Sequence, residues 1–463
     1  MDWVPFAFFE EKKMNTEIDL TTGSISKKLL VFSVPLLIAN LLQSLYSIAD
    51  MLVVGRIVGE NGLAAISNAS MITFILTSVC IGITMGGTVL VAQYKGAGSG
   101  QGQIETVGTL FTFSFFAALV ITVLSLYLYE PVFSMLKVPD NAMNDACEYM
   151  KIICFGTVFV FGYNAVCSIL KGFGDSRNPL YFVGIATILN VILDVLLVGY
   201  FDLGTKGAAY ATVFSQGISF VISVVHLRRI HFIFDFTPKN FKIKKDKLLI
   251  ILKIGIPTAV QMVIVNISYT LITGMLNVFG VSIAAAAGIG LKVNTFAGMP
   301  CWAVGQSVTA MVGQNMGIKN IERTRKTVKA GIYLGIAVTL ITTVLVQIFA
   351  EPIITLFVDS SNTEVIKDGI LYLRICCSVN SLVYAVMYTF DSFAIGVGSA
   401  NIAMVNAILD ACVVRLLVSW LLAFALGFGF IGIFIGQALS PLIPALAGFI
   451  YYQRKTWEKK NLI

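Results

Sequence analysis

Apolar residues dominate the chain in long blocks that short polar segments separate. A membrane-spanning helix needs about 20 predominantly apolar residues, and twelve blocks reach that length. The first six are predicted at 28–54, 63–94, 106–129, 146–170, 179–200 and 207–227, and the second six at 248–278, 284–315, 328–350, 368–395, 401–427 and 430–452. The pattern predicts an all-α polytopic membrane protein with twelve transmembrane helices.

The second six blocks repeat the first six at an offset of about 222 residues. Matching pairs, in one order along both halves, are Pro35 and Pro257, Gln93 and Gln314, Gly96 and Gly317, Tyr149 and Tyr372, Gly172 and Gly396, and Gly174 and Gly398. Two like halves in a membrane create a cavity at their interface, and rocking of one half against the other opens it to alternate sides. We therefore expect two pseudo-symmetric six-helix bundles, an architecture typical of a transporter.

Composition agrees with this reading. The chain is 57% hydrophobic and 12% charged, with a mean hydropathy of +0.86, which excludes a soluble protein of 463 residues. One long basic segment, interrupted by Pro238, separates the halves. The expected organisation is an N-terminal cytoplasmic segment (1–25), an N-lobe (26–228), a basic cytoplasmic linker (229–246), a C-lobe (247–455) and a cytoplasmic tail (456–463).

The basic residues predict the orientation. If both termini are cytoplasmic, most of the 32 Lys and Arg residues fall on the cytoplasmic side, and the outer loops receive only Arg56, Lys137, Lys206 and Lys367. Cytoplasmic loops of membrane proteins carry an excess of Lys and Arg. The formal net charge of +7 is explained by this asymmetry, so we expect a lipid bilayer as the surrounding partner and no nucleic acid.

Polar residues inside the N-terminal blocks form the sharpest candidate site. Asp50 lies within the first predicted span, and an ionised group in the hydrocarbon core is costly unless it meets water, a partner or a proton. Asn190 and Asp194 are four residues apart, so they share one helix face, and Thr212 adds a hydroxyl. These oxygen ligands suit a proton or a small cation. The alternatives are solvation of Asp50 beside Arg56 and ordinary helix-packing hydrogen bonds.

The second half lacks this set. Asp410 and Arg415 share the eleventh span and are placed to compensate each other, while Lys292 in the eighth span could pair across the lobe. Asp391 lies about one turn from the cytoplasmic end of the tenth span, where a solvated interface is an equal alternative to a site. The two halves therefore share a frame but differ in chemistry.

Absent motifs narrow the class. The sequence contains no GxxxxGK[ST] phosphate loop and no HExxH metal motif. An internal ATPase and a membrane-embedded enzyme are therefore disfavoured, no cofactor is expected, and energy must come from an ion gradient.

Several fragments resemble one family, MATE (multidrug and toxic compound extrusion), over about residues 26–455. They are Asp50 with Val54-Gly55-Arg56, Leu63-Ala64-Ala65, Val91-Ala92-Gln93-Tyr94-Lys95-Gly96, the run from Ser168 to Ser176, Asn190 to Asp194, and Gly207-Ala208-Ala209 with Ala211-Thr212. The resemblance implies a V-shaped pair of bundles in a prokaryotic cytoplasmic membrane. It also implies an antiporter, expected to be a monomer, that expels amphipathic, often cationic drugs as protons or Na⁺ enter.

Carried onto this sequence, the family's N-lobe cluster comprises the ion-coupling candidates Asp50, Asn164, Asn190, Asp194 and Thr212. Weaker candidates for the substrate cavity are Gln43, Lys292, Asp391, Asp410 and Arg415. No metal site is firm, although Asp50, Asn190, Asp194 and Thr212 could hold Na⁺. The seventh span lacks the acid that another branch of the family uses. A flippase of lipid-linked precursors, with the same architecture, is the alternative; it would need several cations in the cavity.

Overall fold

The computed structural model describes residues 17–230, 232–359, 361–460 and 462–463, and all its regular elements there are helices. Residues 1–16 of the predicted N-terminal segment lie outside this range. The first lobe contains α1 (Ile25–Ile57), α2 (Glu60–Gly96), α3 (Gly100–Met135), α4 (Asp140–Phe173), α5 (Arg177–Asp194), the π-helical turn η1 (Val195–Tyr200) and α6 (Gly204–Arg229).

The second lobe repeats this order with more interruptions. It contains α7 (Lys245–Asn277), α8 (Val281–Gly317), α9 (Ile321–Ile348), α10 (Ala350–Thr355), α11 (Thr363–Cys376), α12 (Val379–Gly396), α13 (Ala400–Ile408), the π-helical η3 (Leu409–Val418) and η4 (Leu421–Ala425), α14 (Gly429–Leu439) and α15 (Leu442–Gln453). Short 3-10 turns, η2 (Pro238–Asn240) and η5 (Thr456–Lys459), lie in the linker and the tail.

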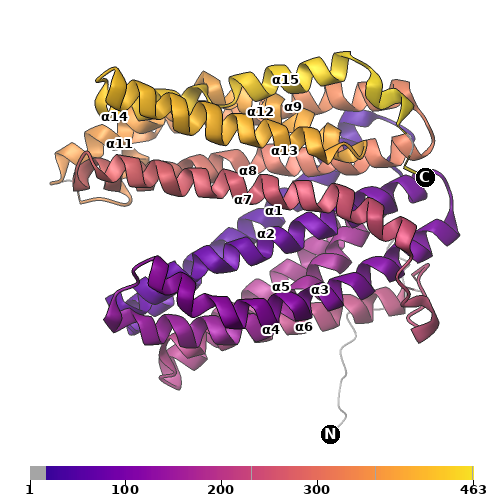
Figure 1. The fold of residues 1–463 in the computed structure, drawn as a ribbon, viewed down its shortest axis with the longest axis horizontal. Helices are drawn as coiled ribbons and strands as arrows, with labels where there is room; N and C mark the ends of the chain where they lie inside the picture. Colours follow the sequence, from indigo (N-terminus) through magenta and orange to yellow (C-terminus); the bar gives the residue numbers. More distant parts are fainter. Residues whose placement is uncertain (1–16, 231, 360, 461) are drawn as a thin grey trace, which may run out of the picture.

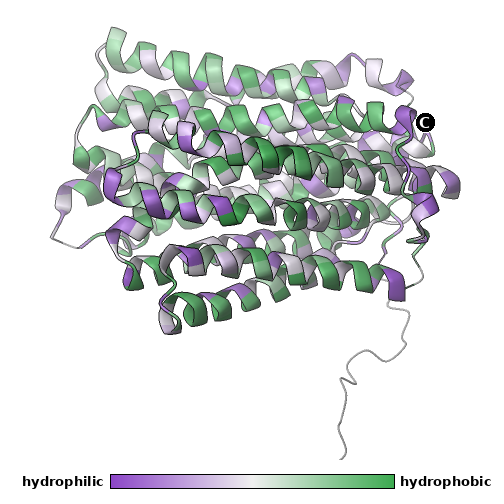
Figure 2. Cartoon of the chain, turned by 60° about the horizontal axis from the view of Figure 1, so that its bottom comes forward, coloured by the Kyte–Doolittle hydropathy of each residue, from purple (hydrophilic) through white to green (hydrophobic). Residues whose placement is uncertain are grey.

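Twelve spans are confirmed, one of them in two pieces. Eleven helices within the described residues are long and apolar enough to cross a membrane, and the pair α11 and α12 makes the twelfth, bent by 48°. The prediction of one continuous helix at 368–395 was wrong at this break. Figure 2 shows that hydrophobic residues fill the middle of the helices and hydrophilic residues gather towards their ends.

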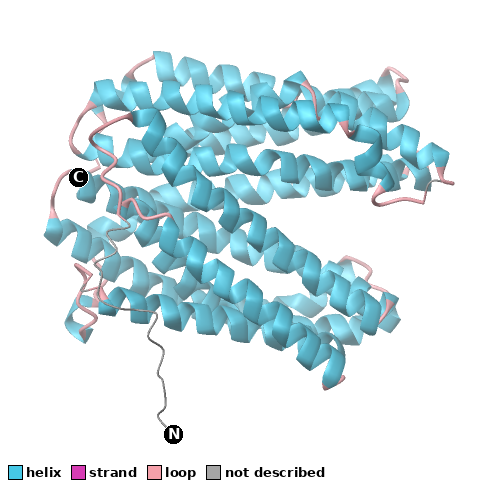
Figure 3. Cartoon of the chain, turned by 180° about the vertical axis from the view of Figure 1, so that it is seen from behind, coloured by secondary structure: helices cyan, strands magenta, loops and turns pink. Residues whose placement is uncertain are grey.

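The two lobes form a V. Figures 1 and 3 show two bundles that meet at the end where the chain terminates and diverge towards the opposite end. At the meeting end, the Ser33 and Ser307 hydroxyls lie 2.8 Å apart across the lobes, and Lys171 Nζ donates to Gln306 Oε1 at 2.9 Å. Proline at matching positions, Pro35 in α1 and Pro257 in α7, lies inside a helix in each lobe.

Equivalent residues of the two halves build this closure. Gln93 Nε2 donates to the Gly396 carbonyl at 3.4 Å, and Gln314 Nε2 donates to the Gly172 carbonyl at 3.0 Å. A Cβ at Gly96 would overlap the Gln314 carbonyl, so only glycine permits the close approach of α2 and α8. The repeat found in the sequence is thus a two-fold symmetric contact in the structure.

The basic linker packs against the first lobe. Phe234 is 1% exposed, and its ring lies 5.9 Å from that of Phe111 in α3 and 5.2 Å from that of Phe241. Burial of large aromatic rings stabilises the segment against the bundle. The connection between the lobes is therefore anchored at its N-lobe side.

Candidate functional site

The N-lobe helices bring the predicted acids together. Asp50 is 6% exposed on α1, and Asp194 is 0% exposed at the end of α5, the helix that packs along α1. Their charges are close enough to act on each other and on the hydroxyl of Tyr46. Thr212 lies on α6, which packs against both α1 and α5. The structure thus assembles one acidic cluster from three helices.

Several polar atoms of this cluster have no protein partner. Asp50 Oδ1, both carboxylate oxygens of Asp194, and both amide atoms of Asn190 are buried and make no hydrogen bond within the described part of the chain. Buried polar atoms are normally paired because an unpaired one costs free energy. The oxygen atoms of this set are therefore suited to receiving a proton or a cation.

No basic residue neutralises the two acids. Among the described residues, neither Asp50 nor Asp194 takes part in an ion pair. Nor do any three His, Cys, Asp or Glu side chains gather there as a metal site would require. A cation at this cluster would need neutral oxygens, such as those of Asn190 and Thr212, beside the two carboxylates.

The corresponding region of the C-lobe is electrically compensated. Arg415 Nη2 donates to Asp410 Oδ2 at 2.7 Å, and both side chains are almost fully buried in the π-helical η3. The guanidinium also lies 4.0 Å from the ring of Tyr269 and donates to Ser268 Oγ at 3.3 Å. The mutual compensation expected of Asp410 and Arg415 is present in the structure.

The remaining candidates are scattered. Asn164 donates to the Val160 carbonyl of its own helix at 2.8 Å, and Gln43 is exposed two turns before Asp50. Lys292 is exposed and forms no ion pair with any described residue, so the expected pairing across the lobe is not made. None of these three side chains forms a hydrogen bond or ion pair with Asp50 or Asp194 within the described part of the chain.

Asp391 is buried rather than solvated. It is 2% exposed on α12, and its carboxylate accepts hydrogen bonds from Asn406 Nδ2 at 2.6 Å and Gln261 Nε2 at 3.4 Å. The solvated-interface alternative was wrong because α13 covers this face of α12 and supplies Asn406.

Sequence reasoning missed two tyrosines of the N-lobe cluster. Tyr46 lies one helical turn before Asp50 on α1, and Tyr149 of α4 packs in the same hydrophobic core as Val54 and Val198. A signal for Tyr46 existed, because it lies four residues before Asp50 and so shares its helix face. Tyr149 was visible only as a marker of the repeat.

Paired six-helix bundles, with an unneutralised acidic cluster inside one of them, define a membrane transporter built from two like lobes. The chain belongs to the MatE family, whose model matches residues 35–196 and 257–421, one match in each lobe. The resemblance seen in the sequence is thereby confirmed, and this is a family of transporters.

Relatives extend the likeness over nearly the whole chain. The probable multidrug resistance protein YoeA of Bacillus subtilis is 28% identical over 95% of this chain and 96% of its own length. The FAD transporter of Shewanella oneidensis is 25% identical over 94% of this chain and 96% of its own length. Similarity to named multidrug resistance proteins supports a drug efflux transporter.

A solved structure shares the fold and its V shape. It is an outward-facing conformation of a multidrug resistance MATE family transporter, with a TM-score of 0.90, 21% identity, and coverage of 98% of this chain and all of that one. The twelve-span, V-shaped architecture is confirmed by this match.

Proposed function

We propose that the protein is a secondary multidrug antiporter that exports amphipathic, often cationic compounds in exchange for protons or Na⁺. One observation carries the proposal: among the described residues, the N-lobe buries Asp50 and Asp194 without a basic partner and with unbonded carboxylate oxygens. In the C-lobe, by contrast, Arg415 pairs with the buried Asp410, and the amides of Asn406 and Gln261 bind the buried Asp391. Keeping two buried carboxylates ionised side by side is costly without a counter-ion. The N-lobe cluster is therefore the place where a cation or a proton gains most.

The mechanism follows from exchange at this cluster. When Asp50 and Asp194 are both ionised, the N-lobe attracts a cationic drug. Uptake of a proton or Na⁺ removes this attraction and favours release of the drug. Asp50 on α1 and Asp194 on α5 lie on packed helices, so a proton or Na⁺ bound at the cluster acts on the pair rather than on one residue. Alternating access then moves the site between the two sides of the membrane.

The packing of the lobes supports an outward-facing resting state. The cross-lobe hydrogen bonds of Gln93, Gln314, Ser33 and Lys171 all lie at the end that carries the first and last described residues, which the basic residues predict to be cytoplasmic. We place the protein as a monomer in the cytoplasmic membrane with both termini inside, in keeping with the positive-inside rule.

The test is dye efflux from proteoliposomes that contain the purified full-length protein. An imposed pH gradient is compared with an imposed Na⁺ gradient, for wild type, Asp50→Asn and Asp194→Asn. Asp202→Asn is the matched control, because this exposed loop residue has a positive φ that Asn tolerates. We expect gradient-driven efflux in wild type and the control, and its loss in both cluster variants.

Other outcomes would redirect the proposal. Full coupling in Asp50→Asn and Asp194→Asn would contradict a role of the cluster. No efflux of any cationic dye under either gradient would favour the flippase alternative. That alternative needs several cavity cations, yet Arg415 is neutralised by Asp410, which leaves Lys292 as the remaining deep candidate. An anionic substrate such as FAD, which the Shewanella relative is named for, would be repelled by the ionised N-lobe acids.

A further inference from the structure

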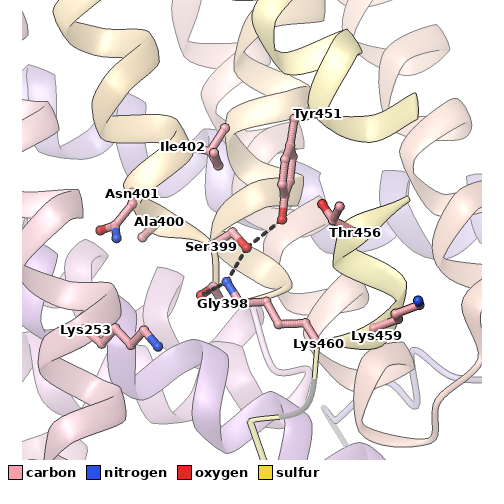
Figure 4. Close-up of a pocket in the computed structure, with 10 residues that line it drawn as sticks. All are labelled: Lys253, Gly398, Ser399, Ala400, Asn401, Ile402, Tyr451, Thr456, Lys459 and Lys460. Atoms are coloured by element: carbon pink, nitrogen blue, oxygen red, sulfur yellow. Dashed lines mark hydrogen bonds between the residues drawn. The ribbon is translucent and has the colours of Figure 1, made fainter. Parts of the chain in front are cut away.

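A pocket lies outside the N-lobe cluster, at the end of the molecule where the chain terminates. Its volume is about 440 Å³, and α7, the α12–α13 turn, α15 and the tail surround it (Figure 4). Lys253, Ser399, Asn401, Tyr451, Lys459 and Lys460 contribute polar groups to its lining. Nothing in the proposed transport mechanism uses this pocket.

Its centre is organised around Ser399. Lys460 Nζ donates to the Ser399 hydroxyl and, at 2.9 Å, to the Gly398 carbonyl. The Tyr451 hydroxyl donates to Ser399 Oγ at 2.6 Å, and Ser399 is 6% exposed. Figure 4 shows the Lys253 side chain reaching towards this centre from α7, whereas the amine of Lys459 points away from it.

The pocket is positively charged without compensation. Its lining includes three lysines and no acid, all within the described part of the chain. Burial lowers the pKa of the Lys460 ammonium group, and the nearby positive charge of Lys253 lowers it further. An anion between these two lysines would relieve their repulsion.

Helix α13 adds to this field. It begins at Ala400, directly after Ser399, so its N-terminal N–H groups lie at the pocket wall. The N-terminus of a helix carries a partial positive charge and unpaired donors, which favour phosphate. Hydroxyl groups and lysine ammonium groups are the other usual partners of a phosphate oxygen.

We propose that this pocket binds the phosphate group of an anionic ligand, supplied either by an anionic phospholipid or by a soluble phosphate monoester. Basic pockets between transmembrane helices on the cytoplasmic side commonly receive lipid headgroups. The pocket lies at the chain-terminal end of the spans, where headgroups of the adjoining leaflet would be within reach. Lys253 and Lys460 supply the charge, and Ser399, whose oxygen accepts from Tyr451 and Lys460, has its own O–H to donate.

Binding is measured by native mass spectrometry of the full-length protein in detergent. Phosphatidylglycerol is compared with phosphatidylcholine, and glycerol 3-phosphate is titrated separately as the soluble probe. The variants are Lys253→Gln and Lys460→Gln, with Lys459→Gln as the control for charge loss in the same pocket. A lysine near an anionic headgroup is worth about a fivefold change in affinity, so we expect about fivefold weaker binding for Lys253→Gln and for Lys460→Gln. Binding by Lys459→Gln should be unchanged, because its amine points away from the centre of the pocket (Figure 4).

The lipid titration and the glycerol 3-phosphate titration distinguish the two sources of the phosphate group. Saturable binding of phosphatidylglycerol over phosphatidylcholine identifies a lipid, and saturable binding of glycerol 3-phosphate identifies a soluble phosphate. Equal binding of both lipids together with no glycerol 3-phosphate binding would overturn the proposal. Equal affinities in wild type and Lys253→Gln would also overturn it. Lys253→Gln decides, because Lys253 is exposed and its replacement leaves the tail hydrogen bonds of Lys460 intact.

Discussion

A buried aspartate has different consequences in the two lobes because its neighbours differ. Asp410 is held by Arg415 at 2.7 Å, while Asp50 and Asp194 face each other's charge without a basic partner among the described residues. Paired charges can remain ionised in a low-dielectric interior, but unpaired ones seek a proton or a cation. The chemistry of the protein is thus asymmetric although its frame is symmetric.

The ion pair makes the effect of replacing Arg415 on stability depend on whether Asp410 is still charged. Arg415→Met would leave Asp410 buried without its counter-charge, and breaking a buried pair from one side costs about 3–5 kcal/mol. We expect a clearly lowered midpoint of thermal unfolding in detergent. The double variant Asp410→Leu with Arg415→Met removes both charges and should recover most of the loss.

The control separates pairing from packing. If Arg415→Met and the double variant unfold at the same temperature, the loss comes from packing of the guanidinium on Tyr269 rather than from the ion pair. If neither differs from wild type, the pair contributes nothing to stability.

Asp19 offers a test outside the membrane. Burial alone would raise the pKa of Asp19, but hydrogen bonds from Thr21 and Thr22 and the charge of Lys28 lower it to about 2. A depressed folded-state pKa means that the charged form stabilises the fold above the ordinary value of 3.8, and that this stabilisation is lost as the pH falls towards 2. We expect Asp19→Asn to unfold at a lower temperature than wild type at neutral pH.

The pH dependence provides the check. Thermal unfolding of both proteins is followed as the pH is lowered from 6, and the difference between them should shrink below about 4 as Asp19 becomes protonated. A difference that stays constant over this range would show that the carboxylate charge is not its cause.

At the scale of single elements, the tenth span contains a break at which amide side chains donate hydrogen bonds to the backbone carbonyls. Its carbonyls at the bend accept hydrogen bonds from Gln347 Nε2, at 2.9 Å for Leu373 and 2.7 Å for Cys377. Asn380 Nδ2 donates to the Cys376 carbonyl at 2.9 Å. Backbone groups at membrane depth must be satisfied internally, so these amide side chains permit the break.

Sequence patterns could place this span but not its break. Hydropathy averages about 19 residues, and the two non-helical residues Cys377 and Ser378 do not change that average. The partner Gln347 comes from α9, about 30 residues earlier, so the compensation becomes visible only when the helices are packed. The averaging that hides the break also explains why the twelve spans were predictable, because each span is an apolar block of about that length.

Gln347→Leu should therefore destabilise the bent span. The Cys377 carbonyl would lose its donor, at a cost of about 1–3 kcal/mol for an unsatisfied buried group. The Leu373 carbonyl would keep the N–H of Cys377, at 3.0 Å. We expect a lower midpoint of thermal unfolding in detergent. Thr295→Val is the comparison, since its hydroxyl bonds only the Leu291 carbonyl of its own helix. Equal midpoints for the two variants would contradict a special role of Gln347.

At the scale of the whole molecule, the sequence repeat proved more informative than single motifs. It predicted which residues correspond, and Gln93, Gln314, Gly172 and Gly396 then form reciprocal contacts across the lobes. The acids Asp50 and Asp194 were also predictable, because charged residues within apolar blocks are rare. Tyr149 was not, since tyrosine is ordinary in membrane helices and only the packing of α4 brings it to the cluster.

The first described residues reinforce the same closure. Leu20 is 0% exposed, and its N–H donates to Gln314 Oε1 at 3.1 Å. The N–H of Ile18 donates to the Gly174 carbonyl of the N-lobe at 3.0 Å, and Asn315 of the C-lobe donates to the Leu20 carbonyl at 3.3 Å. This segment bridges both lobes, so it stabilises the state in which that end is closed.

Closure of that end can be tested by replacing a glycine with alanine at the contact between the lobes. A Cβ at Gly317 would overlap the Gln93 carbonyl of the opposite lobe, whereas one at Gly288, on the same helix α8, would meet nothing within 4 Å. Gly317→Ala should therefore disfavour the closed end and shift the lobes towards opening there. The readout is maleimide labelling of Ser33→Cys, since Ser33 is buried in the closure, in a background without the native cysteines.

We expect faster labelling in Gly317→Ala than in wild type, and unchanged labelling in Gly288→Ala. Both variants add the same methyl group to the same helix, so a difference between them reports the lobe contact rather than helix propensity. If Gly317→Ala labels no faster, α2 and α8 must accommodate the methyl group by separating slightly, and the close approach at Gly317 would not control opening. Faster labelling would instead make the repeated glycine contact the mechanical basis of alternating access, because the same close approach recurs at Gly96 in the other half.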